Sequence, residues 1–161
     1  MDVVSSLRAP IPTRLDRIKE IERTSNWNLE KSKDPICNLE EAHLSVGQNG
    51  LIEIRFESFL RPGENGLHLD TIISRVEAPF FLGGDFVAEA VLANKERLEP
   101  VVLEKTVVFL GAIKNAYHDG VRYLALGRDL AENHWGYEYH AFWTWGFGPK
   151  HLIATARLLD A

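Results

Sequence analysis

Residues 134–146 place the strongest limit on the fold. Their sequence is His-Trp-Gly-Tyr-Glu-Tyr-His-Ala-Phe-Trp-Thr-Trp-Gly, with large aromatic residues at most alternate positions. Successive side chains of a β-strand point to opposite faces, so this spacing predicts a strand with one aromatic face. The aromatic face holds Trp135, Tyr137, Tyr139, Trp143 and Trp145, and the opposite face holds His134, Glu138 and His140.

This aromatic row has two interpretations. It can form a core beneath helices, or it can line a pocket or a recognition surface where indole N–H and phenol O–H groups find partners. The usual core residues Leu, Ile and Val are absent from the row, and a dry core would have to satisfy the polar atoms of Trp and Tyr. Both interpretations therefore stay open.

The polar face of the same segment gives weaker evidence of a functional site. Glu138 and His140 lie two residues apart, a spacing that zinc sites on strands use and that also suits an acid–base pair. Zinc needs a third and usually a fourth ligand, and the sequence does not show whether His118, Asp119 or His151 lies close enough to supply one. We interpret this face, including His134, as solvated, and we expect neither a metal nor a cofactor.

Alternating apolar residues predict further strands. Residues 42–46 and 52–56 alternate around a turn, and the phase of the two runs favours a three-residue loop, Gln48 to Gly50, that joins them in a hairpin. A strand with blurred alternation is expected over 67–76, and two more over 121–128 and 151–159.

Helical spacing and capping residues predict the helices. An N-terminal amphipathic helix is expected around Leu15, Ile18 and Ile21, and a short helix over 85–92 with Asp85 as its cap. Pro100 suits the first turn of a longer helix to about residue 118, although the β-branched residues there make a strand through 110 the alternative.

These elements together predict an α+β domain that spans residues 1–161. We expect a curved antiparallel sheet of about six strands, with the N-terminal helix and one or two central helices packed on one face. The apolar loop over 79–84, with Phe80 and Phe81, and the aromatic row together predict the mouth of a pocket between helix and sheet.

Composition excludes several classes of function. The chain has 161 residues, 45% of them hydrophobic and 25% charged, and a net charge of −5 without a basic stripe, so nucleic acid is not expected as a partner. No apolar run approaches the ~20 residues that cross a bilayer. Cys37 is the single cysteine and Met1 to Pro10 lacks a secretory pattern, which predicts a cytoplasmic protein that is not bound to a membrane.

Two functional hypotheses follow, and neither assigns a catalytic residue. The first is an acidic accessory or inhibitor-like protein that binds a partner protein through the aromatic strand, because aromatic residues concentrate at interfaces. The alternative is a domain for a small apolar or aromatic ligand, or a small enzyme. Its pocket would use the aromatic row with Phe80 and Phe81 as walls and Glu138 with His140 as polar groups.

Overall fold

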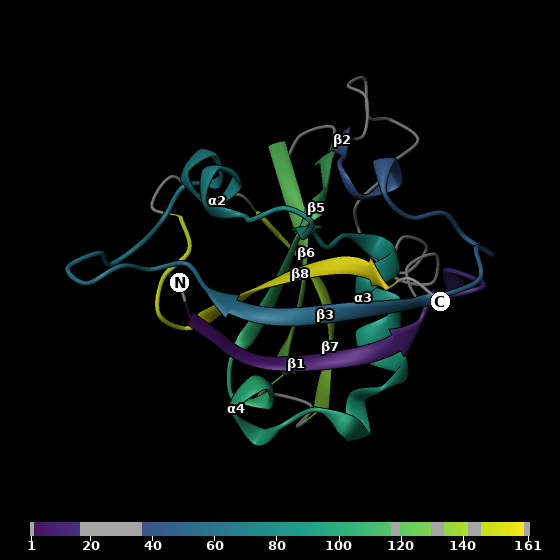
Figure 1. Ribbon diagram of the computed structural model, residues 1–161. Helices are drawn as coiled ribbons and strands as arrows, with labels where there is room; N and C mark the ends of the chain where they lie inside the picture. Colours follow the sequence, from purple (N-terminus) through teal and green to yellow (C-terminus); the bar gives the residue numbers. More distant parts are fainter. Residues whose placement is uncertain (1, 17–36, 117–119, 130–133, 142–145, 160–161) are drawn as a thin grey trace.

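A computed structural model describes residues 2–16, 37–116, 120–129, 134–141 and 146–159, and in parts of the strands, including all of 134–141, it describes the backbone alone. The fold is α+β, with a six-stranded main sheet of order β1-β3-β8-β5-β6-β7. Figure 1 shows β1, β3 and β8 crossing the direction of β5, β6 and β7. The six strands are β1 (Asp2–Pro10), β3 (Leu51–Ser58), β5 (Thr106–Ala116), β6 (Gly120–Asp129), β7 (His134–Ala141) and β8 (His151–Leu159).

The predicted number of strands is confirmed, but a wholly antiparallel sheet is wrong. β5 and β8 run parallel, with Thr106 opposite His151 and Val108 opposite Ile153, whereas the other pairs of the main sheet are antiparallel. Strand alternation defines which face a residue occupies but carries no information about the direction of the neighbouring strand. Two short strands extend the sheet, β2 (Cys37–Asn38) against β5 and β4 (Phe81–Leu82) against β8.

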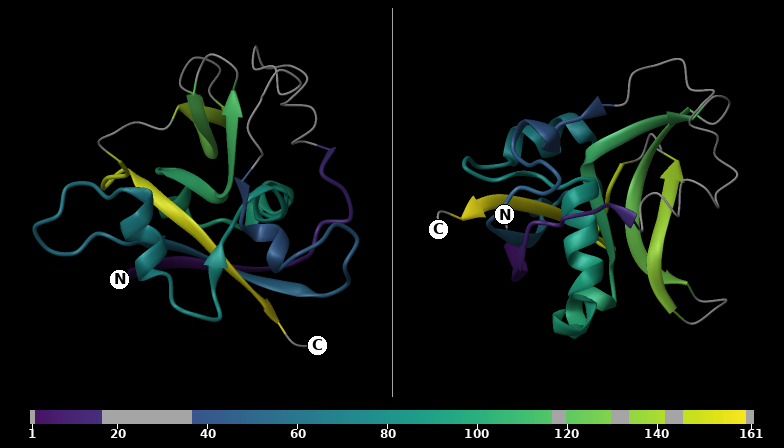
Figure 2. Two further views of the ribbon diagram at one scale, coloured as in Figure 1. Left: turned by 90° about the horizontal axis from the view of Figure 1, so that it is seen from above. Right: turned by 90° about the vertical axis from the view of Figure 1, so that its right-hand side faces the viewer.

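The helices cover both faces of the sheet, which corrects the prediction that they pack on one face. On one face, α3 (Asp85–Ala93) and α4 (Pro100–Leu103) bury Val87, Val91 and Val102 against the strands. On the other face, α2 (Leu69–Arg75) buries Ile72 in a second cluster. Figure 2 shows α2 and α3 on different sides of the sheet. The β5 strand joins the two cores, because Val107 belongs to the first cluster and Val108 to the second.

The first element of the described chain is a strand that we did not predict. In β1, Ser5, Leu7 and Ala9 are buried and Ser6 and Arg8 are exposed, so a period of two was present in the sequence. The serines and Pro10 weakened it. Pro10 is tolerated at the end of a strand that pairs with β3 alone in the described sheet. The expected N-terminal helix, around Leu15, Ile18 and Ile21, is not shown, because residues 17–36 lie outside the described residues.

The predicted hairpin over 42–56 is wrong in its first half. Residues Glu40–Ala42 form a 3₁₀ turn, η2, and Leu44 is buried in the core instead of facing a partner across a turn. The second half is the strand β3, which pairs with β1 and β8. Gly50 has a positive φ of 138°, and it lies between the turn that follows η2 and the start of β3.

The strand predicted over 67–76 is the helix α2. Leu69, Ile72 and Val76 follow a helical spacing and contribute to the second core cluster, whereas Ile73 is 44% exposed. The adjacent isoleucines that blurred the alternation therefore belong to a helix with a narrow apolar stripe.

The long helix predicted from Pro100 ends after one turn, and the alternative that we left open, a strand, is confirmed. α4 starts at Pro100 as expected, but β5 begins at Thr106. The β-branched run favours this central strand, which is buried on both faces. The other predicted strands correspond to β6, β8 and the part of 134–146 that is described, and the short helix to α3.

A buried carboxylate fixes the start of α3. Glu40 is fully buried, and its carboxylate accepts hydrogen bonds from the backbone N–H groups of Gly84, Phe86 (2.7 Å) and Val87 (3.2 Å). These N–H groups lie at the start of the helix, where backbone N–H groups have no acceptor within the helix itself. Asp85, which we predicted as the cap, follows the N-cap residue Gly84. The first turn of α3 is therefore capped by Glu40, which lies 44 residues before Gly84 in the chain.

Candidate functional site

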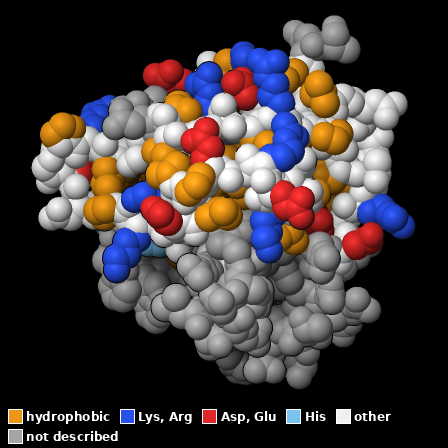
Figure 3. Space-filling model, turned by 90° about the horizontal axis from the view of Figure 1, so that it is seen from below, with side chains coloured by type: hydrophobic (Ala, Val, Ile, Leu, Met, Phe, Trp, Pro, Cys, Tyr) orange, Lys and Arg blue, Asp and Glu red, His pale blue; other side chains and the backbone are white. Residues whose placement is uncertain are grey.

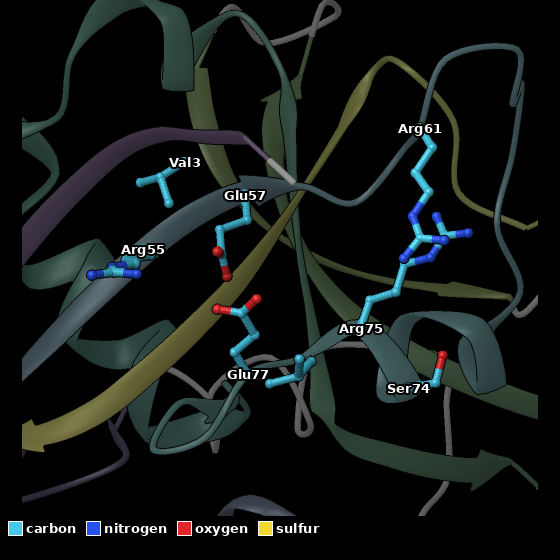
Figure 4. A pocket seen from close by; sticks show the side chains of 8 residues that line it. Val3, Arg55, Glu57, Arg61, Ser74, Arg75 and Glu77 are labelled. Carbon is cyan, nitrogen blue, oxygen red and sulfur yellow. The ribbon is translucent and has the colours of Figure 1, made fainter.

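A pocket of about 450 Å³ lies on the face of the sheet that carries α2. It is bounded by the start of β1, by β3, and by the segments on either side of α2. Figure 4 shows charged side chains converging from these elements. The lining residues are Val3, Arg55, Glu57, Arg61, Ser74, Arg75, Val76 and Glu77.

Strand alternation places the first charged residues of the pocket. In β3, Ile54 and Phe56 face the core with α3, so Arg55 and Glu57 lie on the opposite face. Glu57 is 7% exposed and accepts a hydrogen bond from the Thr155 hydroxyl at 2.6 Å. This bond from the neighbouring strand β8 holds a buried carboxylate at the pocket wall.

Arg75, in the last turn of α2, forms the best-defined ion pair of the site. Its guanidinium donates to both oxygens of Glu64, at 2.6 and 2.8 Å, and to the carbonyl of Phe59 at 2.6 Å. The hydrogen bonds from Arg75 lower the pKa of Glu64 to about 2. The positive charge of Arg75 is therefore largely balanced within the protein.

Arg61 supplies a second guanidinium beside Arg75 (Figure 4). Its backbone N–H donates to Glu64 at 2.6 Å, and its charge contributes to the lowered pKa of Glu64. Within the described part of the chain, no carboxylate oxygen lies within 4.0 Å of the Arg61 guanidinium. Of the two guanidinium groups, only that of Arg75 is paired with the Glu64 carboxylate, so this end of the pocket carries excess positive charge.

Two carboxylates occupy another part of the pocket. Glu77 follows α2 and is exposed, and Figure 4 shows its carboxylate and that of Glu57 pointing toward one another. Arg55 does not balance them, because it lies 3.8 Å from Glu53 and packs over the Phe80 ring. In Figure 4 the carboxylates of Glu57 and Glu77 lie between Arg55 on one side and Arg61 with Arg75 on the other; we call the two carboxylates the negative end of the pocket and Arg61 with Arg75 its positive end.

Phe80 lies next to this site. The Arg55 guanidinium is 4.1 Å from the centre of its ring, and that of Arg157 is 5.3 Å away. Arg157 also bonds Glu53 at 2.6 Å. Phe80 thus anchors the arginine side chains beside the pocket, whereas Phe81 is buried in the core on the other face and stacks on His43 with ring centres 4.3 Å apart.

Charged and hydrophobic side chains are mixed among the described residues of the face in Figure 3. Mixing of this kind is expected of an ordinary solvated surface. A pocket in which like charges gather at two places is a more specific arrangement.

The predicted aromatic site is tested only at the level of the backbone. β7 is extended, as predicted, and pairs with β6, with Tyr139 opposite Leu124 and Tyr137 opposite Leu126. The same strand contains His134, Trp135, Glu138 and His140, but the structure describes only its backbone. Trp143 and Trp145 fall in 142–145, outside the described residues. The aromatic row therefore remains a prediction.

The sequence held a signal for only two of the eight residues that line the pocket. Arg55 and Glu57 could have been assigned to the polar face of a strand, since they alternate with the apolar residues Ile54 and Phe56. Arg61, Arg75 and Glu77 lie in a turn, a helix end and a connection, and no periodicity links them to β3. Among the described residues, no group of three or more His, Cys, Asp or Glu side chains could hold a metal ion.

Comparison with protein-family models, with curated protein sequences and with solved structures found no match for this chain. Among the helices of the described residues, none is long and apolar enough to span a membrane. Functional inference therefore rests on the geometry of the chain itself.

Proposed function

We propose that this domain binds a small molecule with an acidic group in the pocket between β3 and α2. The observation that carries the proposal is the Arg61 guanidinium, which lies on the pocket wall without an ion-pair partner among the described residues while the neighbouring Arg75 is paired with Glu64. A guanidinium presents a fixed fork of donors that matches carboxylate and phosphate oxygens. A volume of about 450 Å³ lies within the range of small-molecule sites.

This proposal keeps the small-molecule hypothesis drawn from the sequence but changes the chemistry of the ligand. The expected walls were aromatic, and the described walls are charged, with Val3 and Val76 as the apolar exceptions. A charged lining favours a polar ligand, because an apolar molecule would leave arginine and glutamate side chains without solvent or partner. Binding should weaken as salt screens the charges.

Substitution of Arg61 tests the proposal. Isothermal titration calorimetry with acetate, propionate, succinate and inorganic phosphate should reveal at least one binder, and Arg61→Ala should raise its Kd by about tenfold or more, since a charge-assisted hydrogen bond contributes about 1.5–3 kcal/mol. Arg61→Lys should recover part of the affinity because it keeps the charge and loses the fork.

Arg14→Ala is the matched control, because Arg14 is exposed, pairs with Asp16 and lies beyond the end of β1 opposite to Val3. Its Kd should equal that of the wild type. Equal affinity in the Arg61→Ala and wild-type proteins would contradict the proposal, as would the absence of binding by every tested compound that carries an acidic group.

A second candidate function is the binding of a partner protein through the aromatic strand. One observation favours it: β7 is the last strand in the order of the main sheet and pairs with β6. The outer edge of a terminal strand offers N–H and C=O groups to an added strand, and aromatic residues at such an edge add contact area. The proposed partner interface is Trp135, Tyr137 and Tyr139, with Trp143 and Trp145 in the following residues.

Acrylamide quenching of tryptophan fluorescence tests this second proposal. In a Trp27→Phe variant, the remaining tryptophans are Trp135, Trp143 and Trp145. If the row is a recognition surface, quenching of the folded variant should approach that of free tryptophan, because the rings contact water. Strong protection of the three side chains would assign the row to the core and remove this function.

A further inference from the structure

The negative end of the pocket adds a requirement that an acidic ligand alone does not meet. Glu57 and Glu77 direct their carboxylates toward one another (Figure 4). Like charges that face each other repel, most strongly where one of them is shielded from water. Glu57 is held in this buried position by the Thr155 hydroxyl, so it cannot swing away without losing a 2.6 Å hydrogen bond. A cationic group placed between the two carboxylates would relieve the repulsion.

Among the described residues, no Lys or Arg side chain forms an ion pair with Glu57 or Glu77. Arg55 is directed to Glu53 and Phe80, and Arg75 is committed to Glu64. A bound divalent ion fits poorly, because calcium takes six to eight oxygen ligands and two carboxylates provide few of them. An ammonium group has three donors and a single charge, which two facing carboxylates can accept.

Resting on the proposed function of this pocket, we infer that its ligand is a small zwitterion, an amino acid in the broad sense. The acidic group binds Arg61 at the positive end, and the ammonium group binds between Glu57 and Glu77. A pocket whose charged residues all had one sign would have fitted a simple acid or a simple amine. The separation of charge within one pocket of about 450 Å³ instead fits a short molecule that carries both.

The experiment compares compounds that differ in one charge. Titration calorimetry is performed with β-alanine, 4-aminobutyrate, 5-aminovalerate and 6-aminohexanoate, each beside the acid and the amine of the same chain length. At least one zwitterion should bind about tenfold or more tightly than its matched acid and its matched amine. The best chain length then measures the separation of the two ends.

Substitution at the negative end gives a readout that a loss of folding cannot imitate. Glu77 is exposed, so Glu77→Gln should fold, and it should abolish the preference for the zwitterion while affinity for the simple acid stays equal or rises. Glu104→Gln, an exposed glutamate at the end of α4 on the other side of the sheet, should change neither affinity.

The possible results separate the two proposals. Acids that bind as tightly as the zwitterions, with dependence on Arg61 retained, would overturn the zwitterion inference and leave the proposed function intact. The same holds if Glu77→Gln leaves the preference unchanged. No binding by acids and zwitterions alike would overturn both.

Discussion

Replacing Glu40 with alanine is expected to lower the free energy of unfolding by about 3 kcal/mol or more. The change leaves the N–H groups of Gly84, Phe86 and Val87 without their acceptor, in surroundings where residues 81–90 are all buried. Each orphaned buried donor costs about 1–3 kcal/mol. Urea denaturation followed by far-ultraviolet circular dichroism measures the difference.

A surface glutamate provides the control for this variant. Glu96 lies in the 3₁₀ turn η3 (Lys95–Arg97) and is exposed, so Glu96→Ala should change stability by less than about 0.5 kcal/mol. A domain of this size is stable by about 5–15 kcal/mol, which allows Glu40→Ala to remain partly folded. A loss below about 1 kcal/mol would show that the carboxylate is not required at the start of α3.

The same carboxylate should make stability depend on pH. The pKa of Glu40 is raised to about 7. Burial is the main cause and the charge of Asp85 adds to it, whereas the hydrogen bonds from the three N–H groups oppose it. The folded state therefore holds a proton that the unfolded chain releases near pH 4.5. Between these values the folded state binds more protons, so the stability that Glu40 contributes is complete below about pH 4.5 and is lost as pH rises through 7.

The Glu40→Gln variant isolates this effect, because glutamine keeps the size of the side chain and does not titrate. The wild type should lose about 2–3 kcal/mol of unfolding free energy from pH 5 to pH 8 relative to the variant. The ion pair of Glu64 with Arg75 does not interfere with this measurement. Its effect on the pH dependence of stability is confined to pH values below about 4.5, because the pKa of Glu64 is lowered from 4.5 to about 2. Parallel curves for the two proteins over this range would contradict the assignment.

Local sequence pattern predicted the elements whose burial follows a simple period. β3 and β6 were found from alternation, and α3 from its apolar run after a glycine pair. The errors occurred where two periods competed. In α2, the adjacent Ile72 and Ile73 fitted a blurred strand as well as a helix, and only packing against the second core decides, since Ile72 is buried and Ile73 is not.

The candidate site could not be predicted because it depends on contacts between distant elements. Glu57 becomes a pocket residue through Thr155, 98 positions later, and Arg75 through Glu64 and the Phe59 carbonyl. Glu40 is a similar case, since the three N–H groups that it accepts from lie 44 to 47 positions later. Periodicity reports which face of an element is buried, but it does not report which other element covers that face.

Replacing Gly111 with alanine is the second change with a large expected effect. β5 bends at this residue: Phe109 pairs with Leu124 of β6 but the next pair is Ile113 with Tyr123. Within the bend, the Gly111 N–H donates to the Gly83 carbonyl at 2.8 Å. A Cβ atom at Gly111 would lie 2.8 Å from the Gly83 carbonyl carbon and still closer to the Leu82 carbonyl oxygen, so a backbone segment would have to move.

That movement would disturb the start of α3 as well as β5. The Gly111 carbonyl accepts from the Leu39 N–H at 2.7 Å, which holds the segment that leads into Glu40. We expect Gly111→Ala to cost about 3 kcal/mol or more, since overpacking against backbone strains a close-packed core and here also breaks hydrogen bonds. Thermal denaturation should show a Tm several degrees or more below that of the wild type.

Gly127→Ala tests whether the cost arises from the close approach or from the loss of any sheet glycine. Gly127 lies in β6, where a Cβ would meet its nearest atom, the Thr106 hydroxyl oxygen, at 3.5 Å, an ordinary contact. Alanine there should be neutral or stabilising by up to about 1 kcal/mol, because it restricts the unfolded chain. If both variants lose similar stability, the contact between β5 and the Gly83 segment is not what requires glycine at 111. A large loss confined to Gly111→Ala identifies that contact as the one that positions α3 on the sheet.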